Sequence, residues 1–151
     1  MPLRCNEQSF PPRVKCDNMR IEDIDSLLPD PPPRVKKADC LIFCDGKVSW
    51  IIEGKGKALK DMKEQFDSTV DLLNSGSLGV DFGINHQSLK CLVIMEKGMG
   101  GEILFERDDQ KRLRRKGEAD WIKVKNIYPI YVLDRKEIDR ERKNSRGLIG
   151  G

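Results

Sequence analysis

The stretch KKADCLIFCDGKVSWIIEGKGK, residues 36–57, decides the fold, because two apolar runs flank an Asp-Gly pair. Apolar runs around such a pair predict a β-hairpin with strands over residues 34–44 and 47–55. Three ionisable side chains interrupt these apolar runs: Asp39, Glu53 and Lys55. Isolated charges in buried strands are costly, so the three form either a functional site or an ordinary ion pair on an exposed strand face.

The length of the hairpin loop determines whether the two acids converge. A two-residue loop at the Asp-Gly pair places Asp39 opposite Ile52, on the other face of the hairpin from Glu53. A three-residue loop that begins at Cys44 places Asp39 opposite Ile51 and diagonal to Glu53, on the same face. The residues at the turn allow both loops, so the register stays open.

Converging acids in this hairpin would form a metal site. Two adjacent carboxylates repel each other, and both stay ionised only if a divalent cation lies between them. Hard oxygen ligands of this kind select Mg²⁺ or Mn²⁺. Such an ion activates a bound water and polarises a phosphoryl oxygen. Lys55 shares a strand face with Glu53 and could orient the water or stabilise negative charge.

The order of Asp39, a hairpin and the sequence EGK at residues 53–55 resembles the PD-(D/E)XK nuclease superfamily. The acids are 14 residues apart, a spacing typical of that family. The resemblance covers roughly residues 18–95 by the order of the expected elements. It implies an α/β fold of restriction-endonuclease-like type, with a mixed β-sheet flanked by helices. It also implies a Mg²⁺- or Mn²⁺-dependent nuclease that hydrolyses phosphodiester bonds.

The resemblance also implies roles for individual residues. Asp39, Glu53 and the backbone carbonyl of Gly54 would hold the metal, and Lys55 would assist the attacking water. Gln65 stands where many members place a polar helix residue near the site. Members often carry a further acid on the first helix, for which Glu22 is the first candidate and Glu7 and Asp25 are alternatives.

The rest of the chain predicts a single α/β domain over residues 1–151. Leu59, Met62, Phe66, Val70 and Leu73 recur at the spacing of a buried helical face. Other expected elements are a helix over 18–28, a helix over 58–74, a central strand within 88–95, a helix over 102–116, and a last strand region over 121–133. Residues 134–151 are expected to form a frayed helix or a flexible tail.

Two clusters of basic residues are candidate contacts for nucleic-acid phosphates. The first is a helical ridge of Lys57, Lys60 and Lys63. The second lies in KRLRRK, residues 111–116, and comprises Arg112, Arg114 and Arg115. The formal net charge is only +3, so a solvated surface and a favourable helix end remain open alternatives for these clusters.

The cysteines and the apolar runs bear on the compartment. The chain has five cysteines, an odd number, so a disulfide framework is not expected. Cys40, Cys44 and Cys91 are expected as small buried hydrophobes, and a zinc site that joins Cys5 and Cys16 to the first two is a weak alternative. No apolar run approaches the ~20 residues that span a bilayer, and the first residues lack a signal peptide's apolar core. A soluble, cytoplasmic protein is therefore expected.

The sequence thus favours a Mg²⁺-dependent endonuclease that acts on DNA. A homodimer is expected by analogy, because cutting two strands needs two sites. Two other classes remain open. One is a nucleic-acid-binding module on the same fold without catalysis, and the other is a structural or regulatory protein whose charged hairpin faces solvent.

Overall fold

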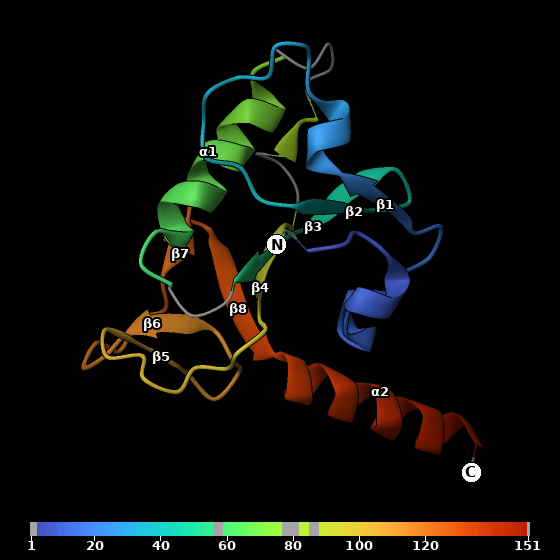
Figure 1. Cartoon of the computed structure of the whole chain (residues 1–151), viewed down its shortest axis with the longest axis vertical. Coiled ribbons are helices and arrows are strands. Elements are labelled where there is room, and N and C mark those ends of the chain that lie inside the picture. Colours follow the sequence, from blue (N-terminus) through green and yellow to red (C-terminus); the bar gives the residue numbers. More distant parts are fainter. Residues whose placement is uncertain (1–2, 56–58, 77–81, 85–87, 151) are drawn as a thin grey trace.

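The computed structural model describes residues 3–55, 59–76, 82–84 and 88–150, the last five without their side chains. The chain is mixed α/β: a large mixed sheet flanked by two helices (Figure 1). The strands of this sheet lie in the order β1 (Arg20–Asp23), β2 (Cys40–Cys44), β3 (Lys47–Lys55), β4 (Lys90–Met95), β8 (Tyr128–Asp134) and β7 (Lys123–Val124). The helices are α1 (Met62–Asn74) and α2 (Arg135–Gly150).

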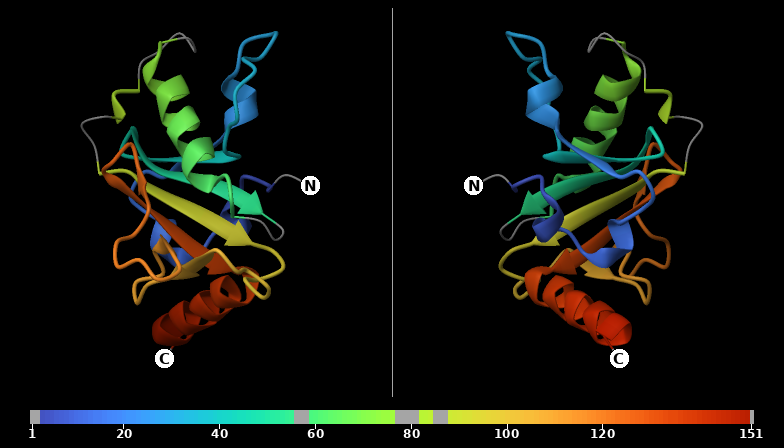
Figure 2. Two further views of the ribbon diagram at one scale, coloured as in Figure 1. Left: turned by 90° about the vertical axis from the view of Figure 1, so that its left-hand side faces the viewer. Right: turned by 90° about the vertical axis from the view of Figure 1, so that its right-hand side faces the viewer.

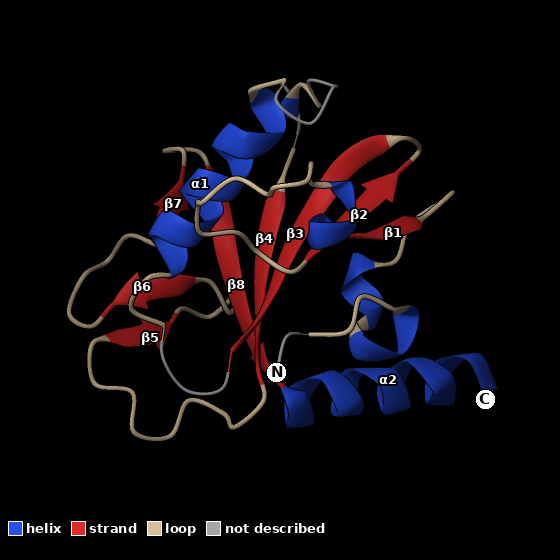
Figure 3. Cartoon of the chain, turned by 45° about the horizontal axis from the view of Figure 1, so that its top comes forward, coloured by secondary structure: helices blue, strands red, loops and turns tan. Residues whose placement is uncertain are grey.

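The middle of the sheet is parallel and its margins are antiparallel. β3, β4 and β8 run parallel, while β1, β2 and β7 pair antiparallel with their neighbours (Figure 3). The predicted central strand within residues 88–95 is confirmed as β4, whose continuous apolar run is buried on both faces. Pro129 lies in β8 but beyond the part that pairs with β4, so its missing N–H leaves that ladder intact.

Each face of the sheet has its own apolar core (Figure 2). α1 covers one face with the predicted stripe, and its five members are all buried: Leu59, Met62, Phe66, Val70 and Leu73. The other face packs against the short 3-10 turns η1 (Glu7–Ser9) and η2 (Pro12–Val14) and against α2, through Phe10, Val14 and Ile138.

The expected helix over residues 18–28 is wrong. Residues 20–23 form the edge strand β1, and a 3-10 turn, η3 (Ile24–Leu27), comes after it. Pairing with β2 outweighs the helical spacing of Ile21 and Ile24, because an edge strand satisfies its backbone groups along a neighbour that is already buried. The Asp23 carboxylate accepts the Asp25 N–H and so caps η3, which is a single short turn.

The expected helix over residues 102–116 is also wrong. A separate hairpin forms there from β5 (Phe105–Arg107) and β6 (Leu113–Arg115). Asp108 builds the turn: its carboxylate accepts the N–H groups of Gln110 and Arg112, and Lys111 takes a left-handed φ of 69°. This local side-chain bonding offers the backbone an alternative to the helix.

The expectation that the chain lacks disulfides is wrong as well. Cys5 pairs with Cys40, and Cys16 pairs with Cys44, at the two ends of β2. Because Cys40 and Cys44 are four residues apart on one strand, both point to the same face, where the N-terminal segment crosses. The alternative expectation of a zinc site is also wrong, because its four cysteines form these two disulfides. Cys91 accounts for the odd number and is buried as a free thiol.

Residues 135–150, expected as a frayed helix or a tail, form α2. Its start is a capping box: the Asp134 carboxylate accepts the Glu137 N–H at 2.8 Å, and the Glu137 carboxylate accepts the Asp134 N–H at 3.0 Å. Arg142 attaches the helix to the N-terminal segment by donating to the Phe10 carbonyl at 2.7 Å. No helix in the described ranges is long and apolar enough to cross a membrane.

Candidate metal site

A β-bulge in the hairpin brings the two predicted acids to one face. The loop has two residues, since Cys44 pairs with Lys47, and both turn residues have positive φ. Between Ile42 and Phe43 the register shifts by one, which leaves Ser49 as the extra residue on β3. From the sequence, a two-residue loop was predicted to place the two acids on opposite faces. This prediction is wrong, because the bulge at Ser49 brings both acids to the same face.

The register beyond the bulge places the acids. Leu41 pairs with Ile51 on the α1 face. Asp39 and Glu53 each lie two residues further from the turn, so their side chains point to that same face. They meet at the end of β2, where Asp39 also contributes its backbone N–H to the Ile52 carbonyl at 3.1 Å. The sheet therefore presents both carboxyl groups at one point.

The two carboxyl groups are hydrogen-bonded to each other, and Glu53 carries the proton. The Glu53 side chain is only 4 % exposed. Burial raises the pKa of Glu53 to about 9, and its hydrogen bond to Asp39 and the charge of that residue act in the same direction. The positive charge of Lys55 and a backbone hydrogen bond at Gly54 partly oppose this rise in the pKa. Near neutral pH, without a cation, Glu53 therefore keeps its proton.

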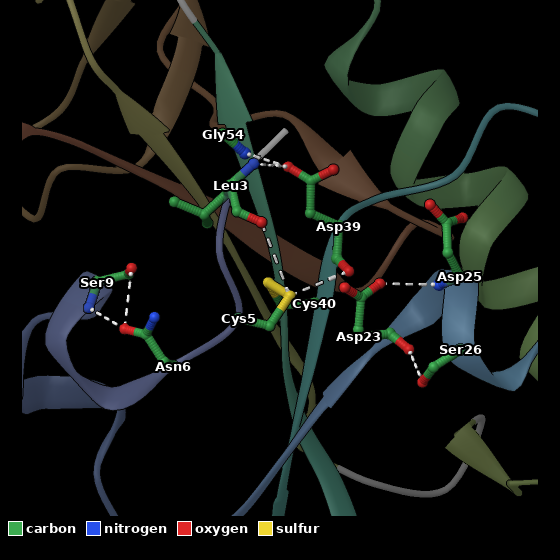
Figure 4. Close-up of a disulfide and its surroundings, with 10 residues drawn as sticks. All are labelled: Leu3, Cys5, Asn6, Ser9, Asp23, Asp25, Ser26, Asp39, Cys40 and Gly54. Atoms are coloured by element: carbon green, nitrogen blue, oxygen red, sulfur yellow. Dashed lines mark hydrogen bonds between the residues drawn. A yellow bond between two sulfur atoms is a disulfide. The ribbon is translucent and has the colours of Figure 1, made fainter. Parts of the chain in front are cut away.

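Asp39 is held by backbone donors on its other side. Its Oδ2 accepts the Gly54 N–H at 3.0 Å and the Leu3 N–H at 3.3 Å (Figure 4). Nothing in the residue types around Leu3 indicated this contact in advance, because it depends on the path that the Cys5–Cys40 disulfide imposes.

Gln65 and Thr69 of α1 fix the backbone that leads into Asp39. Gln65 Nε2 donates to the Lys37 carbonyl at 2.8 Å, and Thr69 Oγ1 accepts the Ala38 N–H at 2.9 Å while it donates to the Gln65 carbonyl. Gln65 was predicted as a catalytic residue, and this geometry makes it a positioning residue. Thr69 was missed, although two polar residues four apart on a buried helical face were a usable signal.

Lys55 and the Gly54 carbonyl complete the predicted set. Lys55 is half-buried, and its charge lowers the pKa of Glu53. The Lys55 carbonyl accepts the Glu96 N–H, toward β4. The backbone groups of Gly54 point the opposite way, because N–H and C=O of one strand residue face the same neighbour. Since the Gly54 N–H donates to Asp39, the Gly54 carbonyl also points toward the side of β3 on which Asp39 lies.

The third acid does not join this pair. Glu22 lies on β1 opposite Leu41 and forms an ion pair with Arg20 at 3.2 Å. Of the alternatives, Glu7 lies in η1 beneath the other face of the sheet, and Asp25 is exposed in η3. Within the described ranges, no three His, Cys, Asp or Glu side chains come close enough together to hold a metal ion.

The donor set that remains fits a hard divalent cation. It comprises the Asp39 and Glu53 carboxyl groups on one face of the sheet, and the Gly54 carbonyl, which points within the sheet plane toward the side where Asp39 lies. Mg²⁺ is commonly held by one or two carboxylates and keeps several waters, so a third acid is not needed. A divalent cation bound here would take over from the Glu53 proton in balancing the charge of the two acids.

The predicted phosphate contacts divide into two groups. Lys57 lies outside the described residues. Lys60, Lys63 and Arg115 line a groove of about 400 Å³ between the start of α1 and the β5–β6 hairpin. Arg112 and Arg114 are instead engaged with the acids of their own hairpin, Asp108 and Glu106.

The groove also contains residues that the sequence did not indicate. Its floor includes Phe105, and its rim includes Trp121 and Lys123, whose Nζ lies 5.2 Å from the centroid of that tryptophan ring. Two carboxylates, Glu118 and Asp120, also line it. Lys63 is paired with Asp67 at 2.6 Å, whereas Lys60 has no ion pair within the part of the chain that the structure describes.

Comparison with known protein families, with curated proteins and with solved structures finds no match for this chain. The functional argument therefore depends on the geometry of the site itself.

Proposed function

We propose that the chain is a metal-dependent nuclease of restriction-endonuclease-like type that hydrolyses phosphodiester bonds in DNA. The observation that carries this proposal is the convergence of the Asp39 carboxyl group and the buried Glu53 carboxyl group on one face of neighbouring strands, with the charge of Lys55 acting on Glu53. Two acids that converge from neighbouring strands, with a lysine two residues beyond the second, form the arrangement that the superfamily resemblance implies.

The chemistry assigned to the chain's own residues depends on their positions. Asp39, Glu53 and the Gly54 carbonyl would hold Mg²⁺ or Mn²⁺, which supplies a nucleophilic water and polarises a phosphoryl oxygen when bound. Lys55 would hold the attacking water or stabilise negative charge in the transition state. Gln65 and Thr69 keep Asp39 in place by fixing the backbone at Lys37 and Ala38.

DNA is the proposed substrate class, and the basic groove between the start of α1 and the β5–β6 hairpin favours a polyanion. Four cations line it, Lys60, Lys63, Arg115 and Lys123, against two carboxylates. Cations that face phosphates release counterions on binding, so the affinity should fall as salt rises. The homodimer stays a prediction that a solution measurement of mass would test.

The test is cleavage of end-labelled single-stranded and duplex DNA by the reduced protein with Mg²⁺ or Mn²⁺. We expect Asp39→Asn and Glu53→Gln each to lower the cleavage rate about 1000-fold, because either change removes a charge that the metal site needs. Glu137→Gln is the matched control, since that glutamate is also largely buried but lies elsewhere. Unchanged cleavage by both site variants would contradict the proposal.

A nucleic-acid-binding module without catalysis is the second candidate, and the basic groove is the observation that favours it. Such a module would bind DNA in a salt-dependent way, with no Mn²⁺ binding at Asp39 and Glu53 and no cleavage. Lys60→Glu combined with Arg115→Glu should weaken that binding, whereas Glu53→Gln should leave it unchanged.

A further inference from the structure

Residues 3–5, which we call the strap, lie directly against Asp39, one member of the acid pair (Figure 4). The Leu3 N–H donates to Asp39 Oδ2, the same oxygen that accepts the Gly54 N–H. Two backbone donors thus occupy one carboxylate oxygen of a proposed metal ligand. A carboxylate oxygen that already accepts two N–H groups is poorly available to a cation.

The strap is tied to the site by a covalent bond. Cys5 forms a disulfide with Cys40, the residue directly after Asp39. Cys5 Sγ also lies 3.4 Å from the Asp39 carbonyl oxygen. Leu3 is only two residues from this bond, so its N–H stays near the carboxylate as long as the disulfide is intact.

The strap also explains the glycine between the acid and the lysine of EGK. A Cβ added at Gly54 would lie 2.9 Å from Leu3 Cβ and 3.7 Å from Leu3 Cα, closer in the first case than real Cβ atoms come. The φ of Gly54 is not in the left-handed region, so conformational freedom is not the reason for glycine here. The close approach of the strap is the reason.

We infer that the strap is a redox-dependent cover of the acid pair. With the Cys5–Cys40 disulfide formed, the Leu3 N–H occupies Asp39 and hinders a divalent cation; reduction of the disulfide allows the strap to leave. This inference rests on the proposed function, since it assigns a regulation to the same site.

The step is an ordinary thiol–disulfide exchange with a dithiol reductant. One thiolate of the reductant attacks Cys5 Sγ, the more exposed sulfur, and the Cys40 thiolate leaves and takes up a proton. The second thiol of the reductant then displaces Cys5 and closes a disulfide in the reductant. Two electrons pass to the protein, which gains two thiols. Cys91 is buried and takes no part.

The release is local. Phe10 and Val14 are buried beneath the sheet, and the Cys16–Cys44 disulfide holds the segment beyond them. Reduction of Cys5–Cys40 therefore leaves the strap held by the partly buried Leu3 side chain and by the Leu3–Asp39 hydrogen bond. Segments with so few contacts open without global unfolding.

The experiment measures Mn²⁺ binding directly, by the loss of the free-ion signal in electron paramagnetic resonance. The oxidised protein is compared with protein reduced by dithiothreitol and desalted anaerobically, and with oxidised Cys5→Ala and Cys16→Ala. Cys16→Ala is the matched control, because it removes the other disulfide at the far end of β2. Gly54→Ala, which keeps both disulfides but crowds Leu3, is a second way to displace the strap.

We expect reduction, Cys5→Ala and Gly54→Ala each to tighten Mn²⁺ binding about tenfold, as loss of a competing hydrogen bond to a charged group predicts. Oxidised Cys16→Ala should bind as weakly as the oxidised wild type and still respond to reductant. If the oxidised and reduced wild type bind Mn²⁺ with equal affinity and Glu53→Gln abolishes this binding, the proposed role of the strap is overturned but the metal site is retained. No Mn²⁺ binding in any form would overturn both.

Discussion

Glu53 and Glu137 are both largely buried glutamates, and their surroundings are opposite. Glu137 accepts the Asp134 N–H and pairs with Arg107 and with Lys111, the latter at 3.1 Å. Burial alone would raise the pKa of Glu137, but these three donors lower it to about 2. Glu53 faces a second acid, and burial raises its pKa to about 9.

The comparison distinguishes an acid whose charge the chain neutralises from an acid that faces a second carboxyl group. Around Glu137 the chain supplies the neutralising charges and closes the first turn of α2, so the group needs nothing from outside. Around Glu53 the chain places a second acid, Asp39, and Glu53 stays neutral by keeping its proton. Proteins keep such arrangements mainly at functional sites, where an external cation can replace the proton.

The largest expected difference concerns the two lysines beside these glutamates. Lys55→Met should lower the rate constant for Mg²⁺-dependent cleavage about 100-fold, since it removes the group that assists the water. Lys111→Met should leave cleavage unchanged and lower only stability, because Lys111 pairs with Glu137. Single-turnover cleavage of labelled DNA by both variants measures this. Equal losses of rate would remove the distinction between the two regions.

The second prediction concerns stability at Glu137. Glu137→Gln should lower the free energy of unfolding by about 2 kcal/mol at pH 7, because it weakens charge-assisted hydrogen bonds to Arg107 and Lys111. The folded pKa lies below the ordinary value of 4.5, so this stabilisation is present above pH 4.5 and is lost as the pH falls toward 2. Urea unfolding of both proteins at pH 7 and pH 3 tests it; a difference at pH 3 as large as that at pH 7 contradicts it.

The third change is of similar size and has the opposite sign. Metal-free Glu53→Gln should be more stable than the metal-free wild type at pH 8, on the order of 2 kcal/mol, because the amide stays neutral without binding a proton. The folded pKa is raised from 4.5 to about 9, so the wild type loses stability as the pH rises between these values. Thermal unfolding from pH 5 to pH 9, with chelator, measures how the stability of the wild type and of Glu53→Gln depends on pH. A flat profile for the wild type would contradict the raised pKa.

Much of the fold was predictable where one signal acted alone. The hairpin, α1 and β4 are indicated by apolar periodicity and by the Asp-Gly turn, and all three are confirmed, although the first hairpin strand begins at Cys40 and not at residue 34. The two wrong helices have different physical causes. At residues 20–23 pairing with β2 outweighed a helical spacing of apolar residues, and at Asp108 side-chain bonding to the backbone favoured a turn.

The candidate site was predictable in its residues but not in its register. Asp39, Glu53 and Lys55 were identified from type and spacing, whereas the bulge at Ser49 has no sequence signal that separates it from a regular strand. The contact between the strap and Asp39 could not be predicted from the sequence for a related reason. This contact depends on a disulfide between cysteines 35 residues apart, and connectivity cannot be deduced from spacing.

The most direct test of the central claim, that Asp39 and Glu53 form a cation site, is the number of protons released when Mg²⁺ binds. Titration calorimetry of the reduced protein at pH 7, in buffers with different ionisation enthalpies, gives this number. We predict about one proton per Mg²⁺ for the wild type, because the ion replaces the proton on Glu53, and none for Glu53→Gln. Mg²⁺ binding that releases no proton, or that survives Glu53→Gln unchanged, would contradict the claim.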